Sequence, residues 1–145
     1  MMVWDTHCKF CFYWIVRWNK MTGDSIEYRP YTEVSQAYPD IEVKAFQRAV
    51  RLIETDGTIY SGAGAAYRSF TYGTRWVWLW EIYRGQKWFR NLSDAVYDWI
   101  AKNRPFMLKV THLFFGKNPE KSRPYWLVYI VIFGVLVLFV WELRS

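Results

Sequence analysis

The two cysteines of this 145-residue chain stand three positions apart, in the segment Cys8-Lys9-Phe10-Cys11. A short apolar run over residues 2–4 precedes them, and an apolar stretch with helical spacing covers residues 8–19. The pair therefore falls where a strand is predicted to end and a helix to begin. Because two cysteines form at most one internal bridge, several disulfides cannot hold the fold together, and it must rest on a hydrophobic core.

This position favours thiol–disulfide chemistry. The N-terminus of a helix presents free N–H groups and the positive end of the helix dipole, and both stabilise a thiolate. A separation of three residues places the two sulfur atoms on one side of the first turn, close enough to form a disulfide. In such pairs the first cysteine is usually the more exposed nucleophile, and the second resolves the mixed disulfide.

Two other interpretations of the cysteines stay open. C-x-x-C is also half of a zinc site, but the chain has no further cysteine, and His7 and His112 are its only histidines. The pair could also be two incidental buried cysteines. We predict no metal, nucleotide, haem or flavin site, and hence no cofactor.

Predicted strands and helices alternate through the first hundred residues. After the cysteines we predict a strand at 26–29, a hairpin around Asp56–Gly57, a helix from Ala65, a helix at 76–83, and a helix with Leu92, Val96, Trp99 and Ile100 on one face. The hairpin suits a type I′ turn, and Ser93 or Asn91 suits the cap of the last helix. The order βαβ, an unassigned link at 41–48, then ββα is typical of an α/β thioredoxin-like fold.

Three segments share their order and spelling with a known family. Asp5 to Cys11 spells D-x-x-C-x-x-C, residues 56–62 read DGTIYSG, and residues 97–104 read YDWIAKNR. Together they resemble the DCC family of predicted thiol-disulfide oxidoreductases. The resemblance covers about residues 1–105 and implies a thioredoxin-like domain there.

Five residues receive roles in this hypothesis. Cys8 would be the attacking thiolate and Cys11 the resolving thiol. Asp5 could accept a proton from Cys11 if it is buried beneath the motif; the alternative is a helix cap or strand-end turn residue. His7 and Lys9 would tune the thiolate, or they are solvated loop side chains.

Two positions depart from the family patterns. DCC proteins often carry Gly after the motif's Asp, where this chain has Thr6, a residue less tolerant of unusual φ. Thioredoxins carry a cis-proline that faces the cysteines, but residues 46–50 (FQRAV) contain no proline. We therefore do not expect the usual substrate-docking loop of thioredoxins.

Residues 125–141 form a 17-residue run without a charge. Tyr125, Trp126 and Trp141 stand at its ends, where amphipathic rings prefer the membrane interface. We predict a transmembrane helix over residues 124–143; the alternative is a buried core helix or strand pair.

The charge of the chain is concentrated before this run. Residues 84–123 contain nine basic and three acidic residues, which accounts for the whole net charge of +6. We predict a basic juxtamembrane linker at 106–123, and the positive-inside rule then places the N-terminal domain in the cytoplasm on a single-pass anchor. Residues 1–9 do not resemble a signal peptide. The basic residues match no nucleic-acid-binding motif, so we expect no nucleic acid partner.

The 10 Trp, 11 Tyr and 10 Phe residues exceed what such a domain needs. We expect Trp76 and Trp80, on an aromatic helix, to contact membrane lipid or an integral-membrane partner; otherwise these rings fill the core. The sequence thus supports a membrane-anchored thiol-disulfide oxidoreductase. The alternative is an accessory single-span subunit of a larger membrane complex, whose thioredoxin-like domain is mainly a packing module.

Overall fold

The computed structural model describes residues 1–73, 75–121 and 127–133. Its centre is a four-stranded sheet in the order β2-β1-β3-β4. Strands β1 and β2 are parallel, while β3 is antiparallel to both β1 and β4. The strands are β1 (Met2–Trp4), β2 (Tyr28–Pro30), β3 (Arg51–Ile53) and β4 (Ile59–Ser61).

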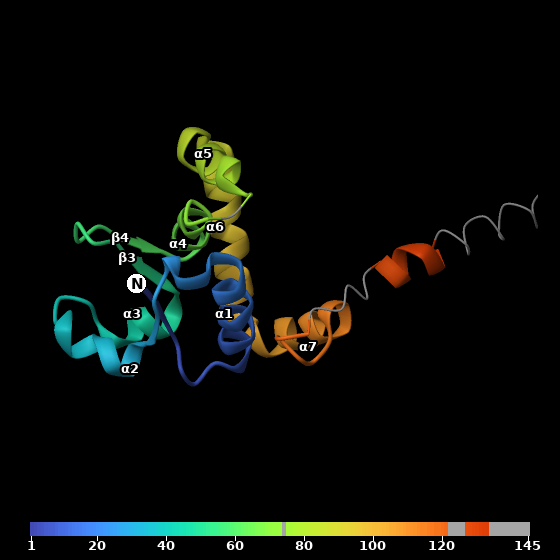
Figure 1. Cartoon of the computed structure of the whole chain (residues 1–145), viewed down its shortest axis with the longest axis horizontal. Coiled ribbons are helices and arrows are strands. Elements are labelled where there is room, and N and C mark those ends of the chain that lie inside the picture. The colour runs from blue at the N-terminus through green and yellow to red at the C-terminus, as the bar shows by residue number, and fades with distance from the viewer. Residues whose placement is uncertain (74, 122–126, 134–145) are drawn as a thin grey trace, which may run out of the picture.

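Helices surround this sheet in the expected order (Figure 1). They are α1 (Lys9–Thr22), η1 (Gly23–Ser25), α2 (Tyr31–Val34), η2 (Ser35–Ala37), α3 (Val43–Arg48), α4 (Ala63–Ser69), α5 (Val77–Gly85), α6 (Lys87–Lys102) and α7 (Arg104–Phe115). This mixed α/β arrangement is consistent with a thioredoxin-like fold. The link at 41–48, which the sequence left unassigned, contains α3.

Each face of the sheet has its own core. Successive residues of a strand point to opposite faces, so neighbours in β1 and β3 enter different clusters. On one face Met2 and Leu52 pack with Ile15 of α1 and Ala65 of α4. The other cluster consists of Val3, Ile53, Tyr31, Val34 and Phe46, from β1, β3, α2 and α3. Strands β1 and β3 therefore contribute buried side chains to both cores.

The hairpin between β3 and β4 forms where predicted, but its turn is not type I′. That turn needs a positive φ at both central residues, and among the described residues only glycines have one, including Gly57 at +86°. The Gly57 N–H donates to the Glu54 carbonyl at 3.1 Å, and the Glu54 N–H donates to the Thr58 carbonyl at 2.9 Å. The turn is therefore a three-residue loop closed by a glycine bulge, and the Asp56 carboxylate supports it by accepting the Thr58 N–H at 2.8 Å.

The predicted helices form with shifted boundaries. Helix α1 ends at Gly23 as expected, where φ is +54°. Helix α6 begins at Lys87 after an extended Gln86, so the predicted cap at Ser93 or Asn91 is wrong. The single extended residue lets α6 start directly after α5. The strand predicted at 26–29 lies at Tyr28–Pro30.

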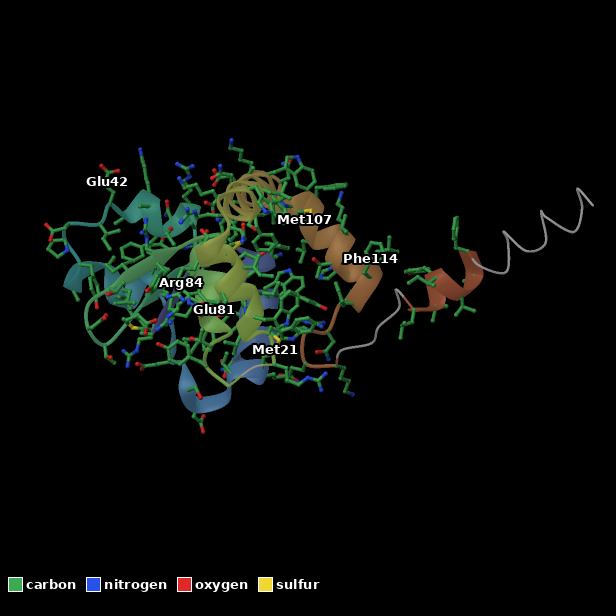
Figure 2. All side chains as sticks on the ribbon, turned by 90° about the horizontal axis from the view of Figure 1, so that it is seen from above. Met21, Glu42, Glu81, Arg84, Met107 and Phe114 are labelled. Carbon is green, nitrogen blue, oxygen red and sulfur yellow. A yellow bond between two sulfur atoms is a disulfide. The ribbon has the colours of Figure 1, made fainter. Side chains whose placement is uncertain are left out.

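Part of the predicted juxtamembrane linker is helix α7. Pro105 lies in its first turn, where the missing N–H of proline costs nothing. Helix α7 packs against α1: the Tyr13 hydroxyl donates to the Gly116 carbonyl at 2.9 Å, and the Trp14 and Phe115 rings meet edge to face. Figure 2 shows Met107 and Phe114 along this helix. The segment before the apolar run therefore belongs to the folded domain at least as far as Phe115.

Most of the predicted transmembrane segment, including Tyr125, Trp126 and Trp141, lies outside the described residues. Within the described part of the chain, no helix has the length and apolar character needed to cross a bilayer. Residues 127–133 are helical, and all seven side chains are exposed. Tyr129 contacts the end of α7, where its hydroxyl donates to the Leu113 carbonyl at 3.2 Å and its ring lies edge-on to Phe114.

Candidate active site

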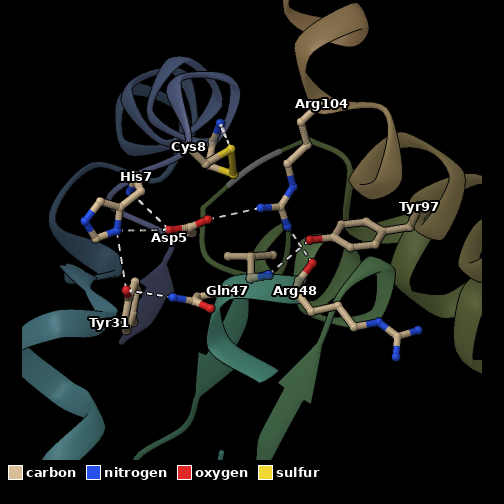
Figure 3. Close-up of polar contacts among 10 residues, drawn as sticks. Asp5, His7, Cys8, Tyr31, Gln47, Arg48, Tyr97 and Arg104 are labelled. Atoms are coloured by element: carbon tan, nitrogen blue, oxygen red, sulfur yellow. Dashed lines mark hydrogen bonds and ion pairs between the residues drawn. A yellow bond between two sulfur atoms is a disulfide. The ribbon is translucent and has the colours of Figure 1, made fainter. Parts of the chain in front are cut away.

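The cysteine pair lies at the strand–helix junction that the sequence predicts. Strand β1 ends at Trp4, and Cys8 is the N-cap residue of α1. Cys8 and Cys11 are joined in a disulfide, with their Cα atoms 5.1 Å apart. The backbone N–H of Cys11 donates to the Cys8 sulfur at 3.0 Å (Figure 3). The first turn of α1 therefore supplies a hydrogen-bond donor directly to this sulfur.

The exposure of the two cysteines is the reverse of the usual pattern. Cys8 is 9% exposed, whereas Cys11 is half-buried. The N–H of Cys8 donates to the Asp5 carbonyl at 3.2 Å, which folds the loop back toward the end of β1. In the disulfide form the first cysteine is thus the more protected one.

Asp5 is both a turn residue and a largely buried carboxylate. Its Oδ1 accepts the N–H of His7 at 3.1 Å, as the strand-end turn alternative expects. Its side chain is only 13% exposed. A carboxylate this far from water needs a charged or hydrogen-bonding partner.

That partner is Arg104, from the start of α7. One guanidinium nitrogen lies 3.2 Å from Asp5 Oδ2, and the other donates to the Arg48 carbonyl at 2.5 Å. Figure 3 shows the guanidinium between the cysteine loop and the end of α3. Arg104 was not among the predicted site residues, although the family-like segment at 97–104 ends on it.

Tyr97 of α6 forms a hydrogen bond with the segment between α3 and β3. Its hydroxyl accepts the N–H of Val50 at 3.1 Å, and burial raises the pKa of Tyr97. Arg104 and Tyr97 together bind the peptide groups of Arg48 and Val50, in the segment where a thioredoxin has its cis-proline. No described peptide bond is cis. Side chains from α6 and α7 therefore form hydrogen bonds with the backbone groups that flank the cysteine site.

His7 and Lys9 lie on the outer side of the motif. The His7 imidazole is 74% exposed, with Nδ1 3.8 Å from Asp5 Oδ1 and 3.4 Å from the Tyr31 hydroxyl. That hydroxyl in turn accepts a hydrogen bond from the Gln47 amide at 3.0 Å. Lys9 is the exposed first residue of α1. His7 therefore lies beside the polar side chains around Asp5, and Lys9 adds a positive charge at the helix N-terminus.

The candidate ligands of the zinc interpretation have other contacts in the structure. Both cysteines are used in the disulfide, and the His112 ring packs against Tyr13 at 5.7 Å. Across residues 1–73, 75–121 and 127–133 no three His, Cys, Asp or Glu side chains gather as metal ligands would.

A cavity of about 230 Å³ opens on the Cys11 side of the pair. Its walls are almost entirely apolar and come from α1, the segment before β3, α6 and α7. Asp5 and Arg104 provide the charged part of its lining. Cys11 lines this cavity and Cys8 does not, so a molecule in the cavity would meet the second cysteine.

The family comparison identifies this arrangement. Residues 2–110 match the model of the DCC1-like thiol-disulfide oxidoreductases. The chain belongs to this family. In this DCC1-like protein the matched region contains the cysteine pair, the whole sheet and most of α7, so it agrees with the resemblance read from three segments. No curated protein and no solved structure matches the chain.

The predicted contact residues of this DCC1-like protein fare differently. Trp76 is half-exposed, and its contact with lipid or a membrane partner stays a prediction. Trp80, in contrast to the prediction, is buried: its ring meets Tyr60 edge to face at 5.4 Å and lies beneath the Arg68 guanidinium. The side of α5 that carries Trp80 packs against β4 and α4. Trp80 is therefore part of the core.

Proposed function

We propose that this protein is a thiol-disulfide oxidoreductase that cycles Cys8 and Cys11 between dithiol and disulfide. The observation that carries the proposal is the hydrogen bond from the Cys11 N–H to the Cys8 sulfur at the N-terminus of α1. In the reduced protein the same donor and the helix dipole would stabilise a Cys8 thiolate. Family membership over residues 2–110 supports the same activity.

The reaction would take place in two exchanges. The Cys8 thiolate attacks one sulfur of a substrate disulfide, forms a mixed disulfide and releases the other sulfur as a thiolate. The Cys11 sulfur, after losing its proton, then attacks Cys8. This step forms the Cys8–Cys11 disulfide and releases the second substrate thiolate. Asp5 lines the same cavity as Cys11, so we assign it the Cys11 proton, with Arg104 holding the carboxylate in place.

Trapping of the mixed disulfide tests these roles. In a Cys11→Ser variant treated with oxidised glutathione, the Cys8 thiolate should form a mixed disulfide that nothing resolves, and intact mass should rise by one glutathione. Cys8→Ser is the matched variant and should trap much less. Equal trapping by both variants would contradict the assignment, and trapping only at Cys11 would reverse it. The test is informative because Cys8 has the lower exposure of the two cysteines.

We further propose that residues 124–143 anchor the protein in a membrane, with the domain on the cytoplasmic side. The uncharged run and the basic residues before it support the anchor and its orientation. The exposed apolar side chains at 127–133 agree with a lipid environment. Wild-type chain should resist alkaline extraction from membranes, and Val131→Arg should weaken this resistance. A wild-type chain that washes off completely would refute the anchor.

A second candidate function is an accessory subunit of a larger membrane complex. The observation in its favour is the apolar stripe of α6, formed by Trp88, Leu92, Val96 and Trp99, each at least 48% exposed. Exposed apolar patches of this kind mark interaction surfaces. After extraction in a mild detergent, the subunit should elute in a large particle. A particle no larger than the 17.6 kDa chain with its micelle would exclude this function.

A further inference from the structure

A second cavity, which we call the polar cleft, lies between the α3–β3 segment and α6. Its volume is about 380 Å³, within the range of roughly 300–1,000 Å³ that small-molecule sites occupy. Charged side chains and the turn from β4 into α4, residues 61–63, line it. The polar cleft shares Ala49 and Tyr97 as wall residues with the apolar cavity beside Cys11, so it lies next to the cysteine site.

The two walls of the polar cleft carry opposite charges. The wall formed by α3 and β3 contributes Arg48 and Arg51. The facing wall, formed by α6, contributes Asp94 and Asp98. Among these four side chains, Arg48 and Asp98 form an ion pair at 3.5 Å. A molecule that carries both carboxylate and ammonium groups would find a partner of opposite charge for each.

Arg51 is a partly buried cation without a carboxylate partner. Its Nη2 donates a long hydrogen bond of 3.5 Å to the Ala45 carbonyl, its guanidinium lies 5.6 Å from the centre of the Phe46 ring, and it forms no ion pair with any described acid. By contrast, the partly buried Arg68 and Arg104 each pair with a carboxylate. Burial lowers the pKa of Arg51, as expected for a cation that lacks a counter-ion. Arg51 is therefore suited to bind the carboxylate of a ligand.

Asp94 supplies an acceptor on the facing wall. Its Oδ1 accepts the Tyr83 hydroxyl at 2.8 Å, whereas its Oδ2 has no hydrogen-bond partner among the described residues. The Asp94 side chain is exposed, so a ligand can reach it from solvent. An ammonium group carries three donors and suits a free carboxylate oxygen. Together with Arg51, this acceptor favours a zwitterion over a simple anion, which the carboxylates of the α6 wall would repel.

Arg104 connects the polar cleft to the cysteine loop. Its guanidinium pairs with Asp5 and binds the carbonyl of Arg48. Figure 3 shows this guanidinium between the disulfide on one side and Tyr97 and Arg48 on the other. An extended tripeptide spans about 10 Å at roughly 3.3–3.6 Å per residue. A short peptide bound in the cleft would therefore extend toward the cysteine pair.

We propose that the polar cleft binds the zwitterionic body of glutathione and thereby selects it as the small-thiol partner of Cys8 and Cys11. Glutathione carries one ammonium and two carboxylates, which match Asp94 and the two arginines of the facing wall. In the exchange, the disulfide bond of oxidised glutathione breaks, the Cys8–Cys11 disulfide forms, and the two thiol protons pass to the two glutathione sulfurs. The exchange rests on the proposed function, whereas binding rests on the cleft and its charges.

Binding can be measured without any exchange. S-methylglutathione keeps all three charges but has no free thiol, so it leaves the Cys8–Cys11 disulfide intact. With the disulfide-bonded full chain in detergent micelles, calorimetry should show saturable binding. Arg51→Gln should weaken it about tenfold, the effect of one lost hydrogen bond between charged groups. The dimethyl ester of the probe lacks both carboxylates and should bind wild type at least about tenfold more weakly.

A matched control and a second variant complete the binding test. Arg84→Gln removes an exposed arginine of α5 that does not line the cleft, and it should bind like wild type. Asp94→Asn changes an exposed side chain and should weaken binding even if Arg51→Gln does not fold. Absence of saturable binding would overturn the proposal, as would wild-type affinity in either variant once it is shown to be folded.

Exchange rates separate the polar cleft from the chemistry of the cysteines. Reduced Arg51→Gln should react about tenfold more slowly than wild type with oxidised glutathione. With bis(2-hydroxyethyl) disulfide, which carries no charge, the two proteins should react at the same rate. Equal slowing with both disulfides would show that Arg51 does not select glutathione. A chain that reacts with both disulfides but does not bind S-methylglutathione would leave the proposed function intact and refute only the glutathione site.

Discussion

Arg104 shows what a single residue contributes to this site. It pairs with the largely buried Asp5 and binds the Arg48 carbonyl, so it ties the cysteine loop to the end of α3. The sequence named burial of Asp5 only as the condition for its role as proton acceptor. It could not predict the partner, because the two residues are 99 positions apart and only the packing of α7 brings them together.

Replacement of this arginine should destabilise the fold. Arg104→Gln leaves the Asp5 carboxylate without its cation, and we expect the free energy of unfolding to fall by about 2 kcal/mol, as measured with denaturant. Arg84→Gln is the matched control. It breaks an exposed pair with Glu81 on α5 (Figure 2), which should change stability by less than about 0.5 kcal/mol. Equal losses in the two variants would contradict the role given to Arg104.

Tyr83 gives a prediction about alkaline pH. Burial and the hydrogen bond to Asp94 raise the pKa of Tyr83 to about 12 from its ordinary 10.0. Because the folded state favours the protonated phenol, this stabilisation is fully present below pH 10 and is lost as pH rises toward 12. Tyr83→Phe should therefore lose less unfolding free energy than wild type between pH 8 and pH 11. An identical loss in both proteins would show that Tyr83 does not contribute.

At the scale of elements, local signals predicted more than long-range packing did. The strand–cysteine–helix junction, the β3–β4 hairpin and the end of α1 at Gly23 follow from residues close in sequence. Helix α7 did not, because Pro105 and the basic residues after it resembled a helix end and a linker. The role of α7 is visible only from its packing against α1, where the Tyr13 hydroxyl donates a hydrogen bond to the Gly116 carbonyl.

The turn from β4 into α4 depends on Gly62. Its φ is +58°, and an added Cβ would lie 3.3 Å from the Tyr97 ring. Gly62→Ala should therefore lower the free energy of unfolding by about 2 kcal/mol. Gly85→Ala is the control, since no atom lies near its added Cβ and its φ is not positive; it should be neutral or slightly stabilising. Equal stability of Gly62→Ala and Gly85→Ala in thermal denaturation would contradict the claim that the Tyr97 ring and the positive φ require glycine at this turn.

At the scale of the whole molecule, the apolar stripe of α6 stands out. Periodicity predicted an apolar face with Leu92, Val96 and Trp99, but not whether the domain would cover it. A neighbouring side of α6 lines the cavity next to the cysteines; it includes Tyr97, Ala101 and Ile100, which the sequence had grouped with the stripe. One side of α6 therefore lines the cavity of the domain, whereas its apolar stripe stays exposed.

Charge placed on this stripe should separate folding from assembly. In Leu92→Glu/Val96→Glu both side chains are already exposed, so the free energy of unfolding should change by less than about 1 kcal/mol. If the stripe docks on a membrane partner, the native particle should shrink in mild detergent while disulfide exchange persists. Unfolding of the variant would show that the stripe belongs to the core, and an unchanged particle would exclude it as the docking face.

The central claim is that Cys8 and Cys11 form a reversible redox couple, and titration of the full chain in glutathione buffers tests it most directly. The fraction of disulfide should follow a two-electron curve, in which the ratio of oxidised to reduced protein changes tenfold per about 30 mV. We expect a midpoint between about −270 and −180 mV, the range of thioredoxins and disulfide isomerases. A pair that stays oxidised through the most reducing buffer, in protein that remains folded, would contradict the proposed activity and leave the disulfide a structural role.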